Sequence, residues 1–312
     1  TLEAEGRLAS LPADFARILR AARRYNLKRN AAYSAALEET CLVLNGIGIE
    51  PVLLKGANRL ADDLYPDTSY RFLNDLDLLI PGDEAAEAHA LLRRSGYRAP
   101  FPFEPPHHLP LLEHPRLPVA IELHHQPLPP PADRILSAAT LARTATRRAF
   151  GAAQVRLPSP FDQVVHLVAA AQIQDSHRWT GTPPLRELLE AALLLARLEP
   201  DGAQMVIERF RHAGFGLSAR VFFVRLAATL GLEAARQMRG GLVPAVINDW
   251  ARLQDRSAIA SAIGRMQRLC GRYALDLQWF VRVPQYRARL IADLGTKSFY
   301  RRKIASVART WR

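Results

Sequence analysis

Two aspartates two positions apart, Asp75 and Asp77, stand at the start of a short apolar run that ends at Ile80. A run this short, closed by Pro81-Gly82, favours a buried β-strand over a helix. Because successive side chains of a strand point to opposite faces, the two carboxylates share one face. Paired carboxylates repel each other unless a cation lies between them, and Mg²⁺ prefers such oxygen ligands together with substrate phosphates. The pattern predicts a metal site, with a solvated strand end as the alternative.

Two further runs carry groups that suit such a site. Residues 49–54 are typical of a short strand, and this strand leads into Lys55-Gly56. A glycine turn that opens a helix presents N–H groups to phosphate, and Lys55 adds a positive charge there. Residues 119–124 form another strand-like run, which contains Glu122. If this strand pairs beside the first one, Glu122 becomes the third carboxylate of the site.

Several motifs follow one another along residues 30–130. They are Leu54-Lys55-Gly56-Ala57, then Arg71-x-x-Asn74-Asp75-Leu76-Asp77, then Gly96-Tyr97, and finally Ile121-Glu122-Leu123-His124. As an ordered set they resemble the nucleotidyltransferase-like proteins of the DNA polymerase β superfamily, above all the bacterial family described as uncharacterised nucleotidyltransferases. A weaker similarity continues to about residue 200.

The resemblance implies a mixed αβ core, a metal-bound nucleoside triphosphate (NTP) as co-substrate, and transfer of a nucleotidyl group. By position, Asp75 and Asp77 would hold Mg²⁺, with Mn²⁺ as the alternative ion, and Glu122 would complete the metal site or act as the base. The chain departs from the wider superfamily at Lys55-Gly56, where Gly-Gly or Gly-Ser is usual. The interval from Gly56 to Asp75 is also longer than in compact members such as aminoglycoside nucleotidyltransferases. The triphosphate cradle is therefore expected to differ.

Other polar residues near these motifs have two interpretations each. Arg71 suits a phosphate or carboxylate contact, and it suits an ion pair with one of the aspartates equally well. His124 shares a strand face with Glu122 and could reach the metal-bound phosphates or make a structural hydrogen bond. Asn74 could touch the ligand or bond locally. The residues expected to bind the nucleotide phosphates are Lys55, Gly56, Arg71 and Asn74.

A second set of polar residues lies in apolar helical patterns further along the chain. As a functional set, together with His124, these residues would shape the pocket of the second substrate. As buried polar groups with ordinary hydrogen-bond partners they would be structural. The set consists of His166, His177, Arg186 and Glu187.

The order of expected elements indicates the fold class. Helices are predicted over residues 11–29 and 31–45, and strands then alternate with helices near 58–64 and 83–95. Residues 134–150 are expected to form a helix or an irregular arm. From Ser159 onward helical patterns dominate. We predict an α+β fold, a small mixed β-sheet nucleotidyltransferase core with flanking helices, followed by a large all-helical C-terminal region.

Two domains are expected, a nucleotidyltransferase-like αβ domain with N-terminal helices over residues 1–150 and a helical domain over residues 151–312. The second domain ends in a basic segment. Residues 282–312 contain nine basic residues and one acidic residue, a net charge of +8 out of the formal +12 of the chain. Such a cluster suits an acidic partner, or it is a solvated basic helix.

The general composition is that of a globular protein. The 312 residues can bury a sizeable core, and no apolar run has the length of a membrane span. Cys41 and Cys270 form no disulfide framework and no metal-ligand spacing, and both are expected to be buried. These features suit a reducing cytoplasm, where we expect the protein to act.

Three functions are compatible with the sequence. The first is transfer of a nucleotidyl group to a small molecule or peptide acceptor, and the resemblance admits modification of a ribosomal peptide of the lasso type. The second is phosphoryl or glycosyl transfer from a nucleotide donor on the same fold, which would differ in the mass of the product. The third is a non-catalytic module that binds nucleotide or RNA, and strong salt dependence without a need for Mg²⁺ would indicate it.

Overall fold

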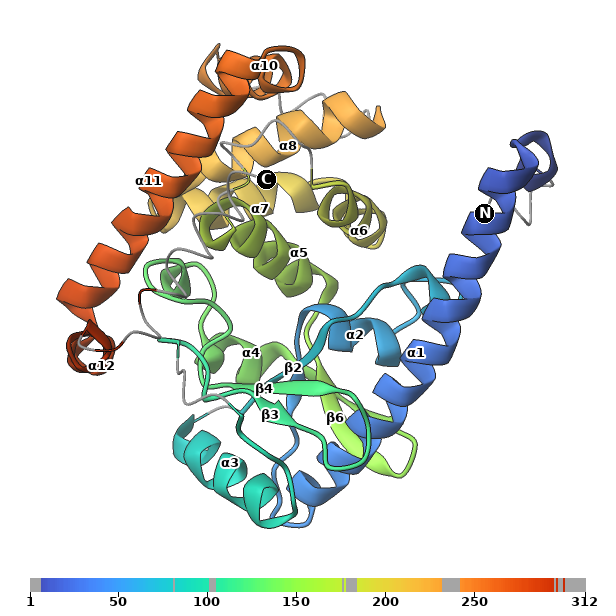
Figure 1. Cartoon of the computed structure of the whole chain (residues 1–312), viewed down its shortest axis with the longest axis vertical. Coiled ribbons are helices and arrows are strands. Elements are labelled where there is room, and N and C mark those ends of the chain that lie inside the picture. The colour runs from blue at the N-terminus through green and yellow to red at the C-terminus, as the bar shows by residue number, and fades with distance from the viewer. Residues whose placement is uncertain are drawn as a thin grey trace. The chain divides into compact units, whose positions relative to one another are not determined.

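A six-stranded mixed β-sheet organises the first half of the computed structural model (Figure 1). Strands β2 and β4 are parallel, as are β1 and β6, and the other three neighbouring pairs are antiparallel. The spatial order is β3-β4-β2-β1-β6-β5. This sheet, with its flanking helices, confirms the predicted fold class. The strands are β1 (Val52–Leu53), β2 (Asp75–Leu79), β3 (Leu112–Glu113), β4 (Ala120–His124), β5 (Thr146–Phe150) and β6 (Ala153–Leu157).

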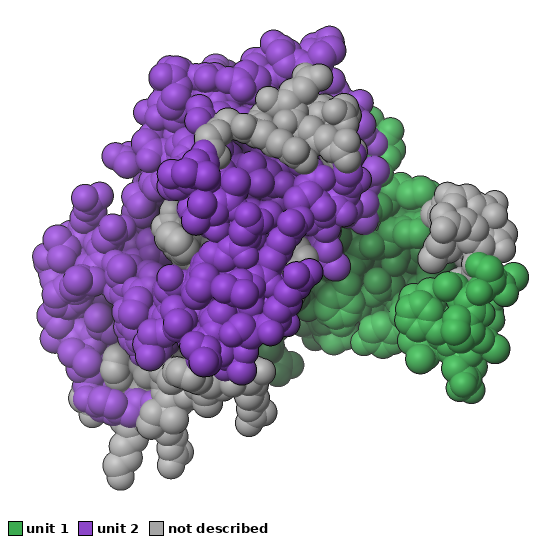
Figure 2. All heavy atoms as spheres, turned by 90° about the horizontal axis from the view of Figure 1, so that it is seen from above, with its two compact units in different colours: residues 1–102, 109–124, 145–157 green, residues 103–108, 125–144, 158–312 purple. Residues whose placement is uncertain are grey.

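The structure describes residues 7–80, 82–100, 105–175, 177, 184–231, 242–294, 296 and 300. The chain divides into two compact units, which Figure 2 shows in two colours. Unit 1 comprises residues 1–102, 109–124 and 145–157, and unit 2 comprises residues 103–108, 125–144 and 158–312. Unit 1 contains the whole sheet. The expected domains, residues 1–150 and 151–312, stay a prediction.

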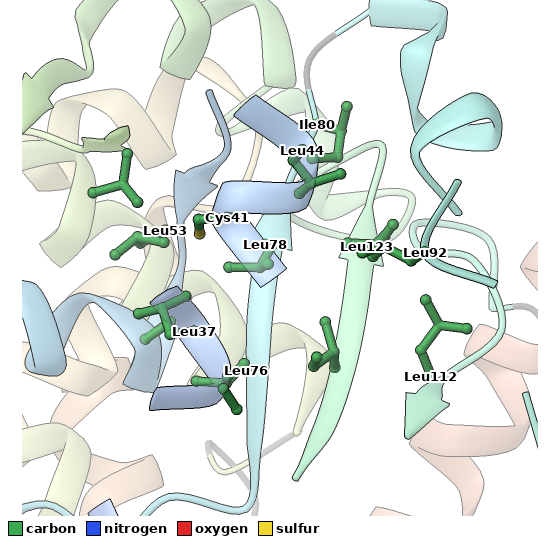
Figure 3. Packing of buried hydrophobic residues seen from close by; sticks show 14 of the residues in the cluster. Leu37, Cys41, Leu44, Leu53, Leu76, Leu78, Ile80, Leu92, Leu112 and Leu123 are labelled. Atoms are coloured by element: carbon green, nitrogen blue, oxygen red, sulfur yellow. The ribbon is translucent and has the colours of Figure 1, made fainter. Parts of the chain in front are cut away.

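The core of unit 1 lies on one face of the sheet. Leu76 and Leu78 of β2 point to this face, where they meet Leu37 and Leu44 of helix α1 (Ala13–Asn45) (Figure 3). Helix α3 (Ala85–Arg94) adds Leu92 to the same cluster. All five side chains are fully buried. Because side chains alternate along a strand, this packing turns the aspartates of β2 to the opposite face.

Helix α1 is one continuous element of 33 residues, whereas the sequence indicated two helices over 11–29 and 31–45. Residues 29–31 contain neither glycine nor proline, so nothing in the backbone chemistry interrupts the helix there. The helix that follows β1 begins at Lys55 rather than near Asn58, and it is short, α2 (Lys55–Ala61).

The expectation for residues 134–150 is wrong in its second half. A helix, α4 (Ala138–Thr144), is present, but Thr146–Phe150 forms strand β5 and pairs with β6 as a hairpin. Gly151 in the turn has φ +57°, a conformation that glycine adopts without a steric penalty. Thr146 to Ala149 are exposed on this edge strand, so the run Thr-Arg-Arg-Ala lacks the apolar alternation that marks a strand.

Unit 2 is helical, as predicted for the C-terminal region. Its first long helix starts where the sequence indicates, since Ser159 Oγ accepts a hydrogen bond from the backbone N–H of Asp162 and Pro160 occupies the first turn. A π-helix, Ala170–Gln174, continues it. The α-helices from there on are α5 (Pro160–Ala169), α6 (Leu185–Leu195), α7 (Gly202–His212), α8 (Gly216–Leu230), α10 (Leu242–Arg256), α11 (Ala258–Arg282) and α12 (Pro284–Leu294).

The two cysteines differ in exposure. Cys41 is fully buried against the sheet, as expected, and burial raises the pKa of its thiol to about 12. The expectation is wrong for Cys270, which is exposed on the outer side of α11. No helix among the described residues is both long enough and apolar enough to cross a membrane. Six of the nine basic residues of the C-terminal segment lie in residues 297–299 and 301–312, outside the described residues.

Candidate active site

The site is built on the register of two parallel strands in unit 1. Asp77 of β2 lies directly opposite Glu122 of β4, and Leu79 lies opposite His124. Residues at even spacing share a face, so Asp75 and Asp77 lie on the same side of the sheet as Glu122 and His124. The pairing on which the third carboxylate depends is therefore present.

Strand β1 brings Lys55 to the same place from the other side of β2. The backbone N–H of Leu54 donates to the carbonyl of Asp77 at 3.0 Å, which ends the β1–β2 pairing. Lys55 follows at once, and its Nζ lies 2.7 Å from Asp77 Oδ1. His124 Nε2 reaches the same oxygen at 2.8 Å and lies 3.6 Å from Glu122 Oε2. Asp77, 1% exposed, is thus the shared partner of the Lys55 ammonium and the His124 imidazole.

The charges of this cluster determine its proton affinities. Burial alone would raise the pKa of Asp77, but Lys55 and His124 hold it well below its usual range. Burial opposes charge on Lys55 and His124 as well, yet their contacts with Asp77 raise the pKa of both. Burial and repulsion from Asp77 raise the pKa of Asp75 to about 6. The cluster therefore contains more carboxylates than its cations neutralise, and a further cation would relieve the excess.

The donor set fits a metal ion. Ligand atoms of Asp77, Glu122 and His124 lie within 4.8 Å of one another. Two carboxylates on one face, with a third at Asp75, offer the hard oxygen donors that Mg²⁺ and Mn²⁺ take, and an imidazole nitrogen is a donor for Mn²⁺ more than for Mg²⁺. Because Lys55 already bonds Asp77 Oδ1, an ion at this oxygen and the ammonium of Lys55 compete for the same lone pairs.

The backbone around Lys55 is unusual. Lys55 has φ +44°, and it is the one residue other than glycine with positive φ among the described residues. Such a conformation costs about 1–3 kcal/mol and persists where surrounding contacts impose it. Gly56 follows in a tight space, since a Cβ on it would lie 2.5 Å from Leu73 Cδ2 and 3.6 Å from Arg71 Nη2. Glycine is needed at position 56 because a larger side chain would collide with the segment that leads into β2.

That segment, residues 67–74, is called the active-site loop below, and one face of α1 holds it. Asn30, 1% exposed, donates through Nδ2 to the carbonyls of Thr68 and Arg71, the latter at 2.7 Å. Tyr33 Oη donates to the carbonyl of Asn74 at 2.8 Å, directly before Asp75. Further bonds join α1 to the loop from Arg23 to Asp67, from Asn26 to Ser69 and from Arg29 to Leu73.

These loop contacts are the part of the site that the motifs did not indicate. Polar residues of α1 at positions 23, 26, 30 and 33 follow the helical repeat of three to four residues, which marks one face of the helix. That spacing was the available signal. The bonding partners are mostly backbone carbonyls, which leave no pattern in the sequence.

The structure places the other predicted phosphate-binding residues as follows. Arg71 is buried, lies against Gly56 and donates to the carbonyl of Phe72. Both interpretations of Arg71, a phosphate contact and an ion pair with Asp75 or Asp77, stay predictions. Asn74 is exposed, and its carbonyl accepts the bond from Tyr33. Lys55 lies at the carboxylate cluster, and Gly56 follows it and lies against Leu73 and Arg71.

Of the residues predicted for a second-substrate pocket, His124 lies in unit 1 at the carboxylate cluster, and the others lie in unit 2. His166 is buried, with Nε2 2.9 Å from the carbonyl of Pro127. Arg225 donates to the carbonyl of His177 at 2.8 Å. Arg186 is exposed and pairs with Glu187. The contact of His166 matches the structural interpretation, and a role in a pocket stays a prediction for all of these residues.

Comparison with known proteins gives one family. A family model described as "uncharacterised nucleotidyltransferase" matches residues 1–231. A crystal structure of ANT(2″)-Ia in complex with adenylyl-2″-tobramycin is 15% identical, with 58% of this chain and 97% of that chain covered and a TM-score of 0.43. A crystal structure of an antigenic nucleotidyltransferase-like protein from Paracoccidioides brasiliensis is 18% identical over 66% of this chain and 92% of that chain, with a TM-score of 0.45. No curated protein matches the sequence.

Proposed function

We propose a reaction for this chain, which belongs to the family described as uncharacterised nucleotidyltransferases. The chain transfers a nucleotidyl group from an NTP to a hydroxyl or phosphate of a small-molecule or peptide acceptor. The metal is Mg²⁺, with Mn²⁺ as the alternative. The observation that carries the proposal is the pairing of Asp77 opposite Glu122 on parallel strands, with Asp75 on the same face and Lys55 beside it. Family membership supports the reaction type, and the carboxylate cluster supports the need for a cation.

In this proposal Asp75 and Asp77 hold the metal, and Glu122 completes the metal site or acts as the base. When bound, the ion supplies charge neutralisation and polarises phosphoryl oxygens. Lys55 is the group that changes partner. Its ammonium bonds Asp77 in the structure, and a metal ion held by the carboxylates would free this ammonium to contact the phosphates. Arg71 and Asn74 at the end of the active-site loop are the other phosphate contacts that we propose.

Glu122 is our choice for the base. The side chain of Glu122 is 18% exposed, whereas that of His124 is fully buried and bonded to Asp77. Glu122 takes the proton of the acceptor hydroxyl as the oxygen forms a bond to the α-phosphorus. The bond from that phosphorus to the pyrophosphate breaks, and pyrophosphate leaves with the electron pair. Positioning and charge stabilisation supply most of the acceleration in such transfers.

Calorimetric titration with ATP, GTP, CTP and UTP, with and without Mg²⁺, tests the proposal. We expect Mg²⁺-dependent binding of at least one triphosphate, lost in Asp77→Ala and Asp77→Asn. The asparagine variant keeps the size of the side chain and removes its charge, so it separates electrostatics from packing. Binding of no triphosphate by folded wild-type protein, or unchanged binding in both variants, would refute the proposed site.

The acceptor is the part of the proposal that needs a separate search. Mass spectrometry of mixtures with candidate small molecules and peptides, including a lasso-type peptide, measures what is transferred. A mass increase equal to a nucleoside monophosphate supports nucleotidyl transfer, and an increase equal to a phosphoryl or sugar group indicates the related transferase activity instead. RNA binding that is salt-dependent and independent of Mg²⁺ would favour a non-catalytic role.

A further inference from the structure

Helix α11 of unit 2 carries a regular apolar stripe on its surface. The 25-residue helix presents apolar side chains at intervals of four, three, four, three and four residues. Apart from Cys270, which is exposed, their exposed fractions range from 44% to 76%. Intervals of this kind are the a and d positions of a heptad repeat, the pattern by which one helix packs against another. The α11 stripe consists of Ile259, Ile263, Met266, Cys270, Tyr273 and Leu277.

The side of α11 that packs inside unit 2 is a different one. Ala260 is buried, and a Cβ on Gly264 would lie 2.0 Å from Gln254 Oε1 of α10. Gln267 accepts a hydrogen bond from Trp250 Nε1 of α10 at 3.0 Å. At 3.6 residues per turn, these positions lie about 100° around the helix from the centre of the α11 stripe. Among the residues that the structure describes, packing on α10 therefore leaves the stripe exposed.

The positions that flank the stripe indicate what covers it. In paired helices the residues beside the a and d positions select the partner, usually by opposite charges. Here they are Ala260, Ala262, Gln267, Leu269, Ala274 and Asp276. Only Asp276 is charged, and it accepts a hydrogen bond from Tyr286 Oη at 3.1 Å. Such flanks contain no charge pattern for a foreign helix, and they let an identical helix approach without like-charge repulsion.

We propose that the α11 stripe of one copy packs against the α11 stripe of a second copy in a two-fold symmetric dimer. A self-complementary patch on both copies is what a two-fold interface requires, and this is the commonest symmetry of soluble oligomers. Cys270 is the middle residue of α11. In a dimer whose two-fold axis passes the middle of α11, Cys270 lies near this axis and close to Cys270 of the second copy. This holds for parallel and for antiparallel helices.

The size of the stripe sets the strength of the association. A helix of 25 residues is about 37 Å long, and a contact strip about 10 Å wide along it covers roughly 400 Å² per copy. Two copies then bury roughly 800 Å², less than the 1,200–2,000 Å² of stable complexes, so the dimer forms in a concentration-dependent equilibrium. Each copy carries a formal charge of +12, and screening by salt therefore strengthens the association.

Analytical ultracentrifugation over a concentration series at low and high salt tests this dimer. Wild-type protein is expected to shift from monomer to dimer as concentration rises, with more dimer at high salt. Leu277→Lys is expected to stay monomeric at all concentrations, and Leu185→Lys on α6 serves as the matched control, because Leu277 and Leu185 are 62% and 60% exposed. Circular dichroism checks that both variants keep their helix content.

Thiol crosslinking gives a second readout that locates the interface. A short bis-maleimide is expected to produce a covalent dimer of the wild type and none of Cys270→Ser, since Cys41 is buried. A wild type that is monomeric throughout the series overturns the proposal, as does a Leu277→Lys variant that dimerises like the wild type. Monomeric protein that co-sediments with anionic vesicles would assign the stripe to a lipid surface and would likewise overturn it.

Discussion

Replacing Lys55 by methionine separates two roles of one ammonium group. In the structure Lys55 Nζ neutralises Asp77, whose side chain is 1% exposed, while the stem of Lys55 packs at the beginning of α2. Methionine keeps an unbranched apolar stem of similar length and removes the charge. The imidazole of His124 then remains as the hydrogen-bond partner of Asp77. We expect the metal-free variant to be less stable and to bind a divalent cation more tightly than the wild type.

The magnitude of each effect follows from burial and distance. Removal of one partner from a buried ion pair costs about 3–5 kcal/mol, and the 29% exposure of the Lys55 side chain together with the remaining His124 places the expected loss near the lower end, about 3 kcal/mol. Two unit charges 4 Å apart interact by about 4 kcal/mol at an effective dielectric constant of 20. Lys55 can swing away from an incoming ion, so only part of this repulsion persists. If about 1.4 kcal/mol of the repulsion between the ion and the Lys55 ammonium remains in the wild type, its removal makes the variant bind the divalent cation about tenfold more tightly.

Urea denaturation of both proteins with and without MgCl₂ measures the two effects in one assay. Stabilisation by a ligand grows with the ratio of its concentration to its dissociation constant, so the free energy of unfolding of Lys55→Met should rise more on addition of Mg²⁺ than that of the wild type. Lys55→Arg keeps a cation and is the matched control. A Lys55→Met protein that gains less from Mg²⁺ than the wild type would show that the ammonium and the metal do not compete, and our reading of the cluster would be wrong.

Three further changes test the parts that surround the cluster. Asn30→Ala leaves one carbonyl of the active-site loop without a buried donor and weakens the bonding of another, so we expect a loss of about 2–4 kcal/mol in urea denaturation and weaker Mg²⁺ binding. Gly56→Ala brings a methyl group 2.5 Å from Leu73 Cδ2 and should destabilise by about 1–3 kcal/mol, which the same assay measures. Burial lowers the pKa of His114 despite the attraction of Glu39, so this residue contributes stability that falls as pH drops below about 6.5, and His114→Gln should flatten that part of the pH–stability curve.

The sequence predicted that the two aspartates of the candidate site share a face, because this geometry is local to one strand. The spacing of Asp75 and Asp77 fixes a common face whatever surrounds the strand. Glu122 joins the two aspartates only if β4 pairs beside β2. The sequence does not show which strands pair over a long range, so this pairing could only be assumed. Register is set by the packing of Leu76 and Leu78 into the core, and that packing depends on α1 and α3 together.

Two predictions are wrong, for residues 146–150 and for Cys270. In both cases the structure depends on what the segment packs against and not on its own sequence pattern. Strand β5 has an exposed polar surface and is ordered through its pairing with β6, which no property of residues 146–150 announces. Cys270 lies in an apolar helical pattern like Cys41, but its helix turns that stripe outward. An apolar stripe indicates that a helix packs against something, and only the arrangement in space shows whether the partner belongs to the same chain.

The hydrogen bonds between α1 and the active-site loop show why this part of the site was not predicted. The cluster motifs are side chains that must have particular chemistry, so their residue types can be recognised. The loop is held through backbone carbonyls, which every residue has, and its donors Asn30 and Tyr33 look like the polar side of an ordinary surface helix. Yet the carbonyl of Asn74, one residue before Asp75, is fixed by Tyr33. The direction in which the first carboxylate leaves the strand therefore depends on a helix residue 41 positions before Asn74. If Tyr33→Phe weakens Mg²⁺ binding while Asn26→Ala, which frees only the carbonyl of Ser69, leaves it unchanged, the decisive contact is the one nearest the carboxylate.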